Sequence, residues 1–225
     1  MARKDYQERL DSLQQDVLYM GEVVKNRLDK GLDALETKDD DLAWEVIEGD
    51  SEVNDLYLEI EQECIDLLAL QQPVAGDLRF IVASFKIITD LERIGDLATN
   101  LGDYALDAER YVFPEVDIRK IGDDASGMVS QAMEAYENEE TDLTYEISEY
   151  DDGLDQRCEE ISSEIIRNLI EMETGEEDEE DIEKTLNEVS RLLLTVRDLE
   201  RVGDHAVNIA ARTLYLVEND DELIW

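Results

Sequence analysis

The sequence is poor in the residues that interrupt helices or build covalent frameworks: its 225 residues include two prolines, eleven glycines, two cysteines and one histidine. With so few interruptions and no alternating Val and Ile runs, the abundance of Leu, Ala, Glu and Asp favours helix over sheet. Cys64 and Cys158 lie far apart with no CxxC spacing, which excludes a disulfide framework and predicts reduced, packed thiols. No stretch reaches the roughly eighteen apolar residues of a membrane span, so we expect a cytoplasmic protein.

Positive charge is also scarce. The chain has 20 Lys and Arg against 61 Asp and Glu, a net charge of −41 and a pI near 4.1. Such a field excludes binding to a nucleic-acid backbone. It also weakens the compact state unless salt screens it, and we interpret it as adaptation to a salty cytoplasm. The 43% apolar content and its long periodicity favour a folded protein over a disordered acidic chain.

Apolar residues that recur every three or four positions predict six helices. An acidic break at 37–41 supplies a cap for the second helix, and Pro73 opens the third. The best linker candidate is 113–116, and 173–180 is predicted to be a solvated acidic loop without chemistry. The predicted helices are 5–35, 42–71, 74–110, 117–136, 143–172 and 181–216.

The two halves of the chain are related. Residues 90–100, DLERIGDLATN, return as 198–208, DLERVGDHAVN, with eight of eleven positions identical. Upstream, 42–60 corresponds to 143–161. The same order of parts therefore occurs twice, and we predict an all-α fold with repeats at 1–112 and 117–225.

Carboxylates replace apolar residues on one helix face in both copies. Glu92 and Asp96 stand one turn apart, and Glu200 and Asp204 repeat the pair. A neighbouring predicted helix offers oxygens at the same spacing. The candidate ligands are Asp50, Asn54, Glu92 and Asp96 in the first copy, and Asp151, Asp155, Glu200 and Asp204 in the second. Asn100 and Asn208 continue the same rows.

Oxygen ligands without thiolates favour a hard cation such as Mg²⁺, Ca²⁺ or Mn²⁺, and carboxylate-rich sites also take iron. Acidic pairs four residues apart are expected by chance in this composition, so the specific signal is the repeated frame. The alternative is that Arg93 and Arg201 neutralise these carboxylates in salt-bridge networks.

Gly95 and Gly203 suit close helix packing or access to a site. His205 matches Leu97 of the first copy, so a packed or solvent-facing side chain is favoured over a ligand role, and Trp44 is predicted to be core.

The doubled DLER[IV]GD frame resembles the PhoU family, as do VIEGD at 46–50, Val53 with Asn54, and QQPVAGDLR at 71–79. The resemblance implies two pseudo-symmetric three-helix bundles. It implies that the eight candidate ligands bind divalent or ferric metal ions (Mg, Mn, Fe or Zn), sometimes as clusters. It further implies a homodimer, peripheral to the membrane, that restrains the Pst phosphate transporter and acts with the sensor kinase PhoR.

The chain departs from this pattern in its second copy, which lacks the QQPVAGDLR segment. Asn54 stands in the first copy where Asp155 stands in the second, which predicts two sites of unequal charge. A salt-adapted host without a PhoR-type kinase would leave the transporter ATPase (PstB-like) as the partner. Two alternatives are a carboxylate-bridged di-iron protein, which requires Glu-x-x-His motifs, and a metal-free helical scaffold. No nucleophile with a base and no phosphate-cradling loop is visible, so we expect no enzyme.

Overall fold

The computed structural model describes residues 3–70, 74–108, 116–172 and 179–224, and within these ranges all regular structure is α-helical. The predicted all-α fold is confirmed. The helices are α1 (Arg3–Thr37), α2 (Asp40–Glu48), α3 (Asp50–Leu70), α4 (Ala75–Leu106), α5 (Ile118–Asn138), α6 (Thr141–Glu171) and α7 (Glu179–Glu218).

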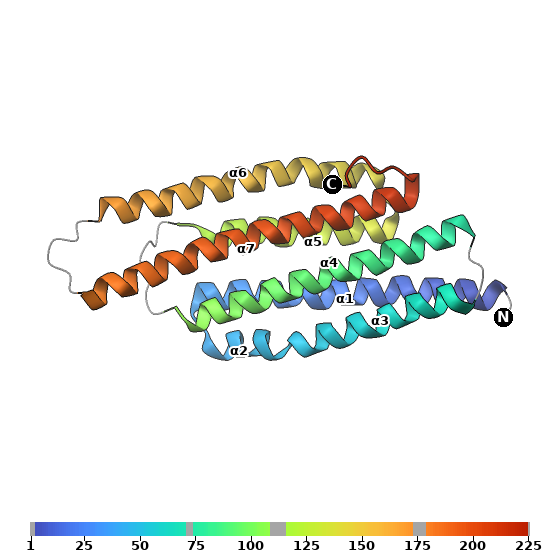
Figure 1. Ribbon diagram of the computed structural model, residues 1–225, viewed down its shortest axis with the longest axis horizontal. Helices are drawn as coiled ribbons and strands as arrows, with labels where there is room; N and C mark the ends of the chain where they lie inside the picture. The colour runs from blue at the N-terminus through green and yellow to red at the C-terminus, as the bar shows by residue number, and fades with distance from the viewer. Residues whose placement is uncertain (1–2, 71–73, 109–115, 173–178, 225) are drawn as a thin grey trace.

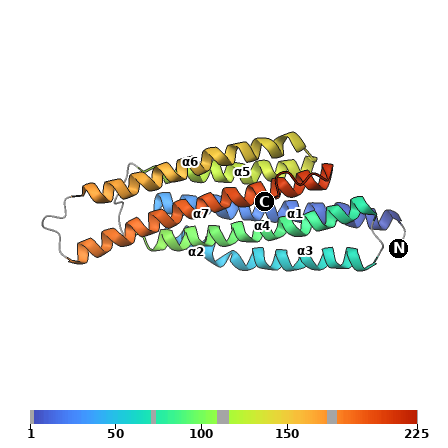
Figure 2. The same cartoon turned by 45° about the horizontal axis from the view of Figure 1, so that its top comes forward.

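The helices form one elongated bundle with the two repeats side by side (Figure 1). In the first repeat α2 and α3 pack against α1 and α4, and in the second α6 packs against α5 and α7. The repeats meet through α1 against α5 and through α4 against α7. Figures 1 and 2 show α4 and α7 running in opposite directions along this seam.

One apolar core runs through both repeats. The stripe predicted on α1 is buried, with Leu13, Val17, Met20, Val24 and Leu28 each at 0% exposure. It belongs to the same cluster as residues of α7 such as Val202 and Ile209. The halves are therefore packed as one body and not as two separated domains. Most of the predicted linker at 113–116 and most of the acidic loop at 173–180 lie outside the described residues.

The second predicted helix is wrong in one respect, because it is broken at Gly49 into α2 and α3. Its start is as expected: Asp39 caps α2 by accepting a hydrogen bond from the Leu42 N–H at 3.1 Å. In the second repeat Tyr150 stands where the first has Gly49, and α6 continues without interruption. Glycine disfavours the helix interior, which is consistent with the break in one copy only.

Both cysteines are buried, whereas Trp44 is exposed. Cys64 and Cys158 are buried and free, as predicted. Trp44 was predicted to be core but is 52% exposed, because Ala43 and Val46 provide the buried face of α2. No helix among the described residues is long and apolar enough to cross a lipid bilayer.

Candidate metal centre

The second repeat brings three of its four candidate ligands together. Asp151 and Asp155 lie one turn apart on α6, and Asp204 faces them from α7. One carboxylate oxygen from each lies within 4.8 Å of the other two. Among the residues described by the structure, this is the one group of three or more acidic, His or Cys side chains so close together.

Asp151 has a carboxylate oxygen that the protein leaves uncompensated. Its Oδ1 is buried and has no hydrogen-bond partner. Burial, followed by repulsion from Asp155, Asp204, Asp152 and Glu200, raises the pKa of Asp151 to about 7. A carboxylate that is buried without a donor loses its hydration uncompensated, so the ionised form is unstable unless a positive charge binds.

Glycine in the repeated frame allows this carboxylate to approach α7. A Cβ placed on Gly203 would lie 2.9 Å from Asp151 Oδ1 and 2.6 Å from Leu154 Cδ2. The prediction that Gly203 serves close helix packing is therefore confirmed. In the first copy Gly95 has the same role, because its Cβ would lie 3.1 Å from Val53 Cγ1.

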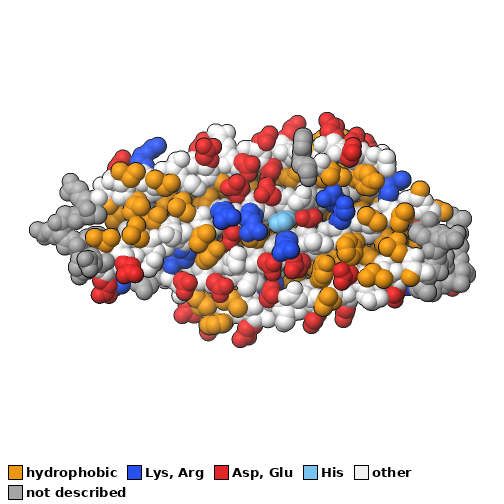
Figure 3. All heavy atoms as spheres, viewed as in Figure 1, with side chains coloured by type: hydrophobic (Ala, Val, Ile, Leu, Met, Phe, Trp, Pro, Cys, Tyr) orange, Lys and Arg blue, Asp and Glu red, His pale blue; other side chains and the backbone are white. Residues whose placement is uncertain are grey.

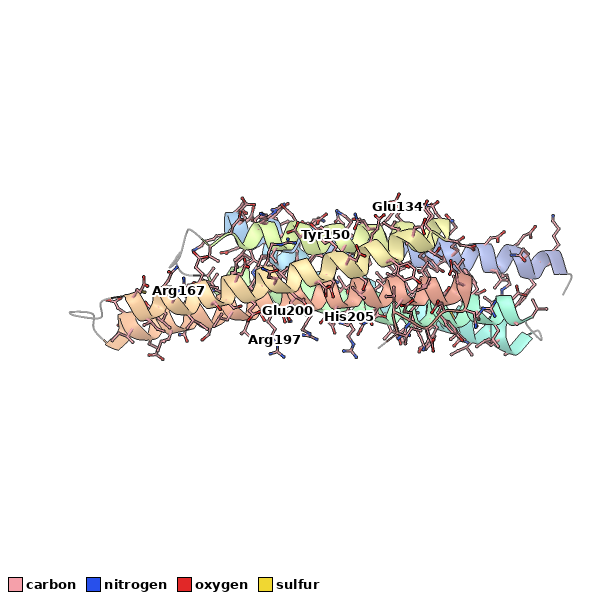
Figure 4. All side chains as sticks on the ribbon, turned by 90° about the horizontal axis from the view of Figure 1, so that it is seen from above. Glu134, Tyr150, Arg167, Arg197, Glu200 and His205 are labelled. Carbon is pink, nitrogen blue, oxygen red and sulfur yellow. The ribbon has the colours of Figure 1, made fainter. Side chains whose placement is uncertain are left out.

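Glu200, the fourth candidate, lies beside this group of three. It shares a shallow hollow with Asp155 and Cys158 on the α6 and α7 surface. Burial and the charges of Asp155 and Asp204 raise the pKa of Glu200. Figure 4 shows Glu200 and His205 on the same helix, with Arg197 projecting outward from it. The donor set of the second repeat is all oxygen, which suits a hard or borderline cation.

The first repeat arranges its four candidates differently. Asp50 Oδ2 accepts a hydrogen bond from Asn54 at 2.8 Å, and Asp50 Oδ1 lies 3.4 Å from the guanidinium of Arg27. Arg93 lies 3.5 Å from Glu92 and 3.7 Å from Asp96. Burial and Asp96 raise the pKa of Glu92, and Arg93 opposes them. The salt-bridge alternative thus has support in this copy, largely through Arg27, which the sequence did not single out.

In the second repeat the corresponding arginine has another role. Arg201 lies 3.5 Å from Asp198, and its ion pair is with that residue and not with Glu200 or Asp204. Met128 contacts Gly203 at the place where Arg27 contacts Gly95. The two copies of the frame are alike in sequence, and their local charge differs through residues outside it.

The first and last residues of the frame bind the two repeats together, which the sequence reasoning missed. Asn100 donates to Asp198 Oδ2 at 3.0 Å, and Asn208 donates to Asp90 Oδ1 at 3.3 Å. The asparagines therefore belong to the contact between repeats and not to the ligand rows. Identity at both ends of the frame was the signal, because a contact that occurs twice about a twofold axis needs both partners twice.

His205 lies at the same contact. Its Nδ1 is 2.9 Å from Asp90 Oδ1, and it is part-buried. The imidazole is directed across the seam at α4 and is not part of the group of three acids. A Glu-x-x-His arrangement of the di-iron type is accordingly not formed by Glu200 and His205.

Known proteins resemble this chain along nearly its full length. The PhoU domain matches residues 17–105 and again 118–213. A phosphate-specific transport system accessory protein PhoU homolog of Pseudomonas putida is 33% identical over 221 residues, which cover 97% of this chain and 82% of that protein. The homolog of Clostridium acetobutylicum is 31% identical, with 96% of both chains covered. The crystal structure of PhoU from Pseudomonas aeruginosa matches with a TM-score of 0.87 at 30% identity, covering 96% of this chain and all of that one.

Proposed function

Because this chain belongs to the PhoU family, we propose that it restrains phosphate uptake from the cytoplasm by binding the ATPase subunit of a Pst phosphate transporter. Its role in the regulation of phosphate transport is that of an accessory protein and not of an enzyme. The observation that carries the proposal is the match of both repeats, in order and over nearly the full length, to accessory proteins of this transport system.

The seam between the repeats supports a docking role. Four basic side chains are exposed along it, Lys86 and Arg93 on α4 and Arg197 and Arg201 on α7, and we call them the basic seam. Figure 3 shows basic side chains, with acidic ones beside them, at the middle of a face that has apolar side chains toward both ends. The chain has about three acidic residues for each basic one, so four exposed basic side chains on one face are unusual in it.

The apolar ends continue the same helix stripes. On α4 the exposed Leu78 and Val82 precede the basic seam, and on α7 Leu186 and Leu194 precede it. Because the helices are antiparallel, the two apolar ends flank the positive middle on both sides (Figure 3). This surface complements a protein partner that presents acidic side chains between apolar ones.

Charge reversal on this face tests the partner. The double variant Lys86→Glu, Arg197→Glu should lose binding to the purified ATPase subunit, because like charges would then face each other. A matched variant, Lys120→Glu with Arg167→Glu, makes the same charge change on exposed positions of α5 and α6 and should bind as wild type does. Equal affinity of the two double variants would reject the seam as the docking surface.

The regulatory role is tested in cells. A strain that lacks the protein should accumulate phosphate under replete conditions, since the transporter is no longer restrained. Where the host has a sensor kinase, the starvation response should also be switched on. Normal uptake and a normal response in the deletion strain would overturn the regulatory proposal.

Homodimer formation is part of the proposal, with the exposed Leu58 and Ile65 of α3 as a candidate contact. Light scattering on Leu58→Glu tests it.

The second-repeat carboxylates give the protein a metal centre in this proposal. Asp151, Asp155 and Asp204, with Glu200 beside them, would hold a divalent or ferric ion and supply the charge that Asp151 lacks. Protein dialysed against Mn²⁺ and then against buffer should retain the ion, and Asp155→Asn with Asp204→Asn should release it. The pair Glu146→Gln and Glu164→Gln removes the same number of negative charges from exposed positions of α6 and should retain it. Equal retention in both variants would reject this site.

A further inference from the structure

Arg27 lies inside the first repeat at the place where the second repeat has no charge. It is 5% exposed, although it comes from α1 and not from the helices that carry the acidic frame. Its Nη2 donates to the Val46 carbonyl at 2.7 Å and to Thr99 Oγ1 at 2.9 Å, and both Nη atoms lie 3.4 Å from Asp50 Oδ1. A guanidinium stays protonated in such a setting, so this positive charge is permanent.

Asp50 and Asp151 occupy equivalent positions, yet both oxygens of Asp50 have donors, whereas Oδ1 of Asp151 is buried without one. The Thr99 hydroxyl lies 3.2 Å from Asp50 Oδ1, and the Asn54 amide donates to Oδ2 at 2.8 Å. In the second repeat Val207 stands in place of Thr99, and Asp155 in place of Asn54. Each exchange removes a hydrogen-bond donor, and the second adds a negative charge as well.

The third exchange is the decisive one. In the second repeat the buried Met128, 1% exposed, has its Cε 3.7 Å from the Cβ position of Gly203. In the first repeat the equivalent place is held by Arg27, whose Nη1 lies 3.5 Å from the Cβ position of Gly95. A neutral thioether thus takes the place of a full positive charge. The surroundings of Asp50 are complete without a metal ion, and those of Asp151 are not.

The backbone of the first repeat is built around the same arginine. A Cβ on Gly49 would lie 3.3 Å from Arg27 Nε, and Val46 is among the last carbonyls of α2, which the helix itself leaves without a partner. Arg27 donates a hydrogen bond to the Val46 carbonyl oxygen at the break between α2 and α3. Where α6 is continuous, no such carbonyl is freed, and Met128 lies beside Gly203 in the place that Arg27 has beside Gly95.

We propose that the guanidinium of Arg27 takes the place of a metal ion in the first repeat, so that this chain holds its cation in the second repeat alone. The inference rests on the metal centre proposed above. A cation at Asp50, Glu92 and Asp96 would have to share Asp50 with a fixed positive charge in a part-buried setting, where repulsion is poorly screened.

The test is Mn²⁺ retained by the full chain after dialysis, measured per polypeptide in molar KCl. Arg27→Met, combined with Thr99→Val and Asn54→Asp, gives the first repeat the residues of the second, and retained Mn²⁺ should roughly double. The reciprocal Met128→Arg should release the Mn²⁺ that wild type retains. Lys30→Met removes one positive charge from an exposed ion pair one turn further along α1 and should change nothing.

The outcomes separate this inference from the metal centre. Wild-type retention that falls by about half in Glu92→Gln with Asp96→Asn would show that the first repeat binds Mn²⁺, and would overturn the inference while the second-repeat centre stands. No gain in the triple variant, with its helix content unchanged, would also overturn it. If that variant does not fold, unchanged retention in folded Met128→Arg overturns it equally. Wild type that retains no Mn²⁺ would instead overturn the metal centre, and the inference with it.

Discussion

Asn100 of the first repeat donates a hydrogen bond to Asp198 of the second at 3.0 Å, and Asn208 returns the same contact to Asp90 at 3.3 Å. Asp198 is 5% exposed and also accepts from the Tyr104 hydroxyl at 2.9 Å. Burial, and then this bond, raise the pKa of Tyr104 to about 12. The reciprocal pairs fix α4 against α7 in one register, and that register positions the basic seam.

Removing one of these amides should destabilise the fold. Asn100→Ala leaves Asp198 with one donor fewer in a buried place, and we expect a loss of about 1–3 kcal/mol in the free energy of unfolding. Asn26→Ala, at an exposed position of α1, should stay within about 0.5 kcal/mol of wild type. Urea denaturation in molar KCl measures both, and equal stabilities would show that the contact contributes nothing.

Two glycines should respond in opposite directions to alanine. Gly203→Ala would bring a methyl group against Leu154 and Asp151, so we expect a loss of about 1–3 kcal/mol together with weaker Mn²⁺ retention. Gly127 lies within α5 with nothing inside 4 Å of its Cβ position, and Gly127→Ala should stabilise by about 0.5–1 kcal/mol. Thermal unfolding of the two variants gives the comparison, and a stabilised Gly203→Ala would contradict the close approach.

Stability of the metal-free protein should fall as pH rises through the titration of Asp151. Its pKa is about 7 in the folded state, against roughly 3.9 in an unfolded chain, so the folded state binds this proton more tightly between the two values. The stabilisation is therefore complete below about pH 4 and is lost as pH approaches and passes 7.

The variant Asp151→Asn isolates this effect. In the presence of a chelator we expect it to raise the free energy of unfolding by about 1–2 kcal/mol near pH 8, with allowance for solvent screening of a half-buried group, and to change it little at pH 4. The exposed Asp152→Asn, one residue along α6, should show a much smaller difference between the two pH values. Parallel pH profiles for Asp151→Asn and wild type would refute the assignment.

Salt should strengthen the fold. With a net charge of −41, self-repulsion opposes the compact state until ions screen it. Circular dichroism should show the helical signal and its cooperativity increasing as KCl rises from millimolar to molar. Full and cooperative helix at millimolar KCl would count against salt adaptation.

Periodicity in the sequence predicted the helices apart from the break at Gly49, and the frame that occurs at 90–100 and again at 198–208 predicted the repeated architecture. The stripe of Leu13, Val17 and Met20 on α1 needs only the 3.6-residue repeat of a helix and burial of its apolar face. The break at Gly49 was missed because one glycine is tolerated in many helices, and the feature that accompanies it, the side chain of Arg27, comes from another helix.

The candidate site was predicted less completely, for the same reason. The spacing of Glu200 and Asp204 identified one helix face, but the charge of a site depends on every helix that packs against it. Arg27 and Met128 lie on α1 and α5, outside the frame, and their meeting with the frame is a property of the packed bundle. Helix spacing shows on which face of α4 Asn100 lies, but not what it contacts on that face. Asn100 was therefore predicted to continue the ligand row, whereas it donates to Asp198.

The difference between Arg27 and Met128 has a consequence for how the molecule can evolve. A symmetric dimer of half-length chains would carry the same residue at both places, so any mutation would alter both sites at once. Duplication and fusion within one polypeptide remove this constraint, because each position is encoded separately. One half can then keep a carboxylate that a fixed guanidinium neutralises, while the equivalent carboxylate of the other half keeps a buried oxygen without a hydrogen-bond donor.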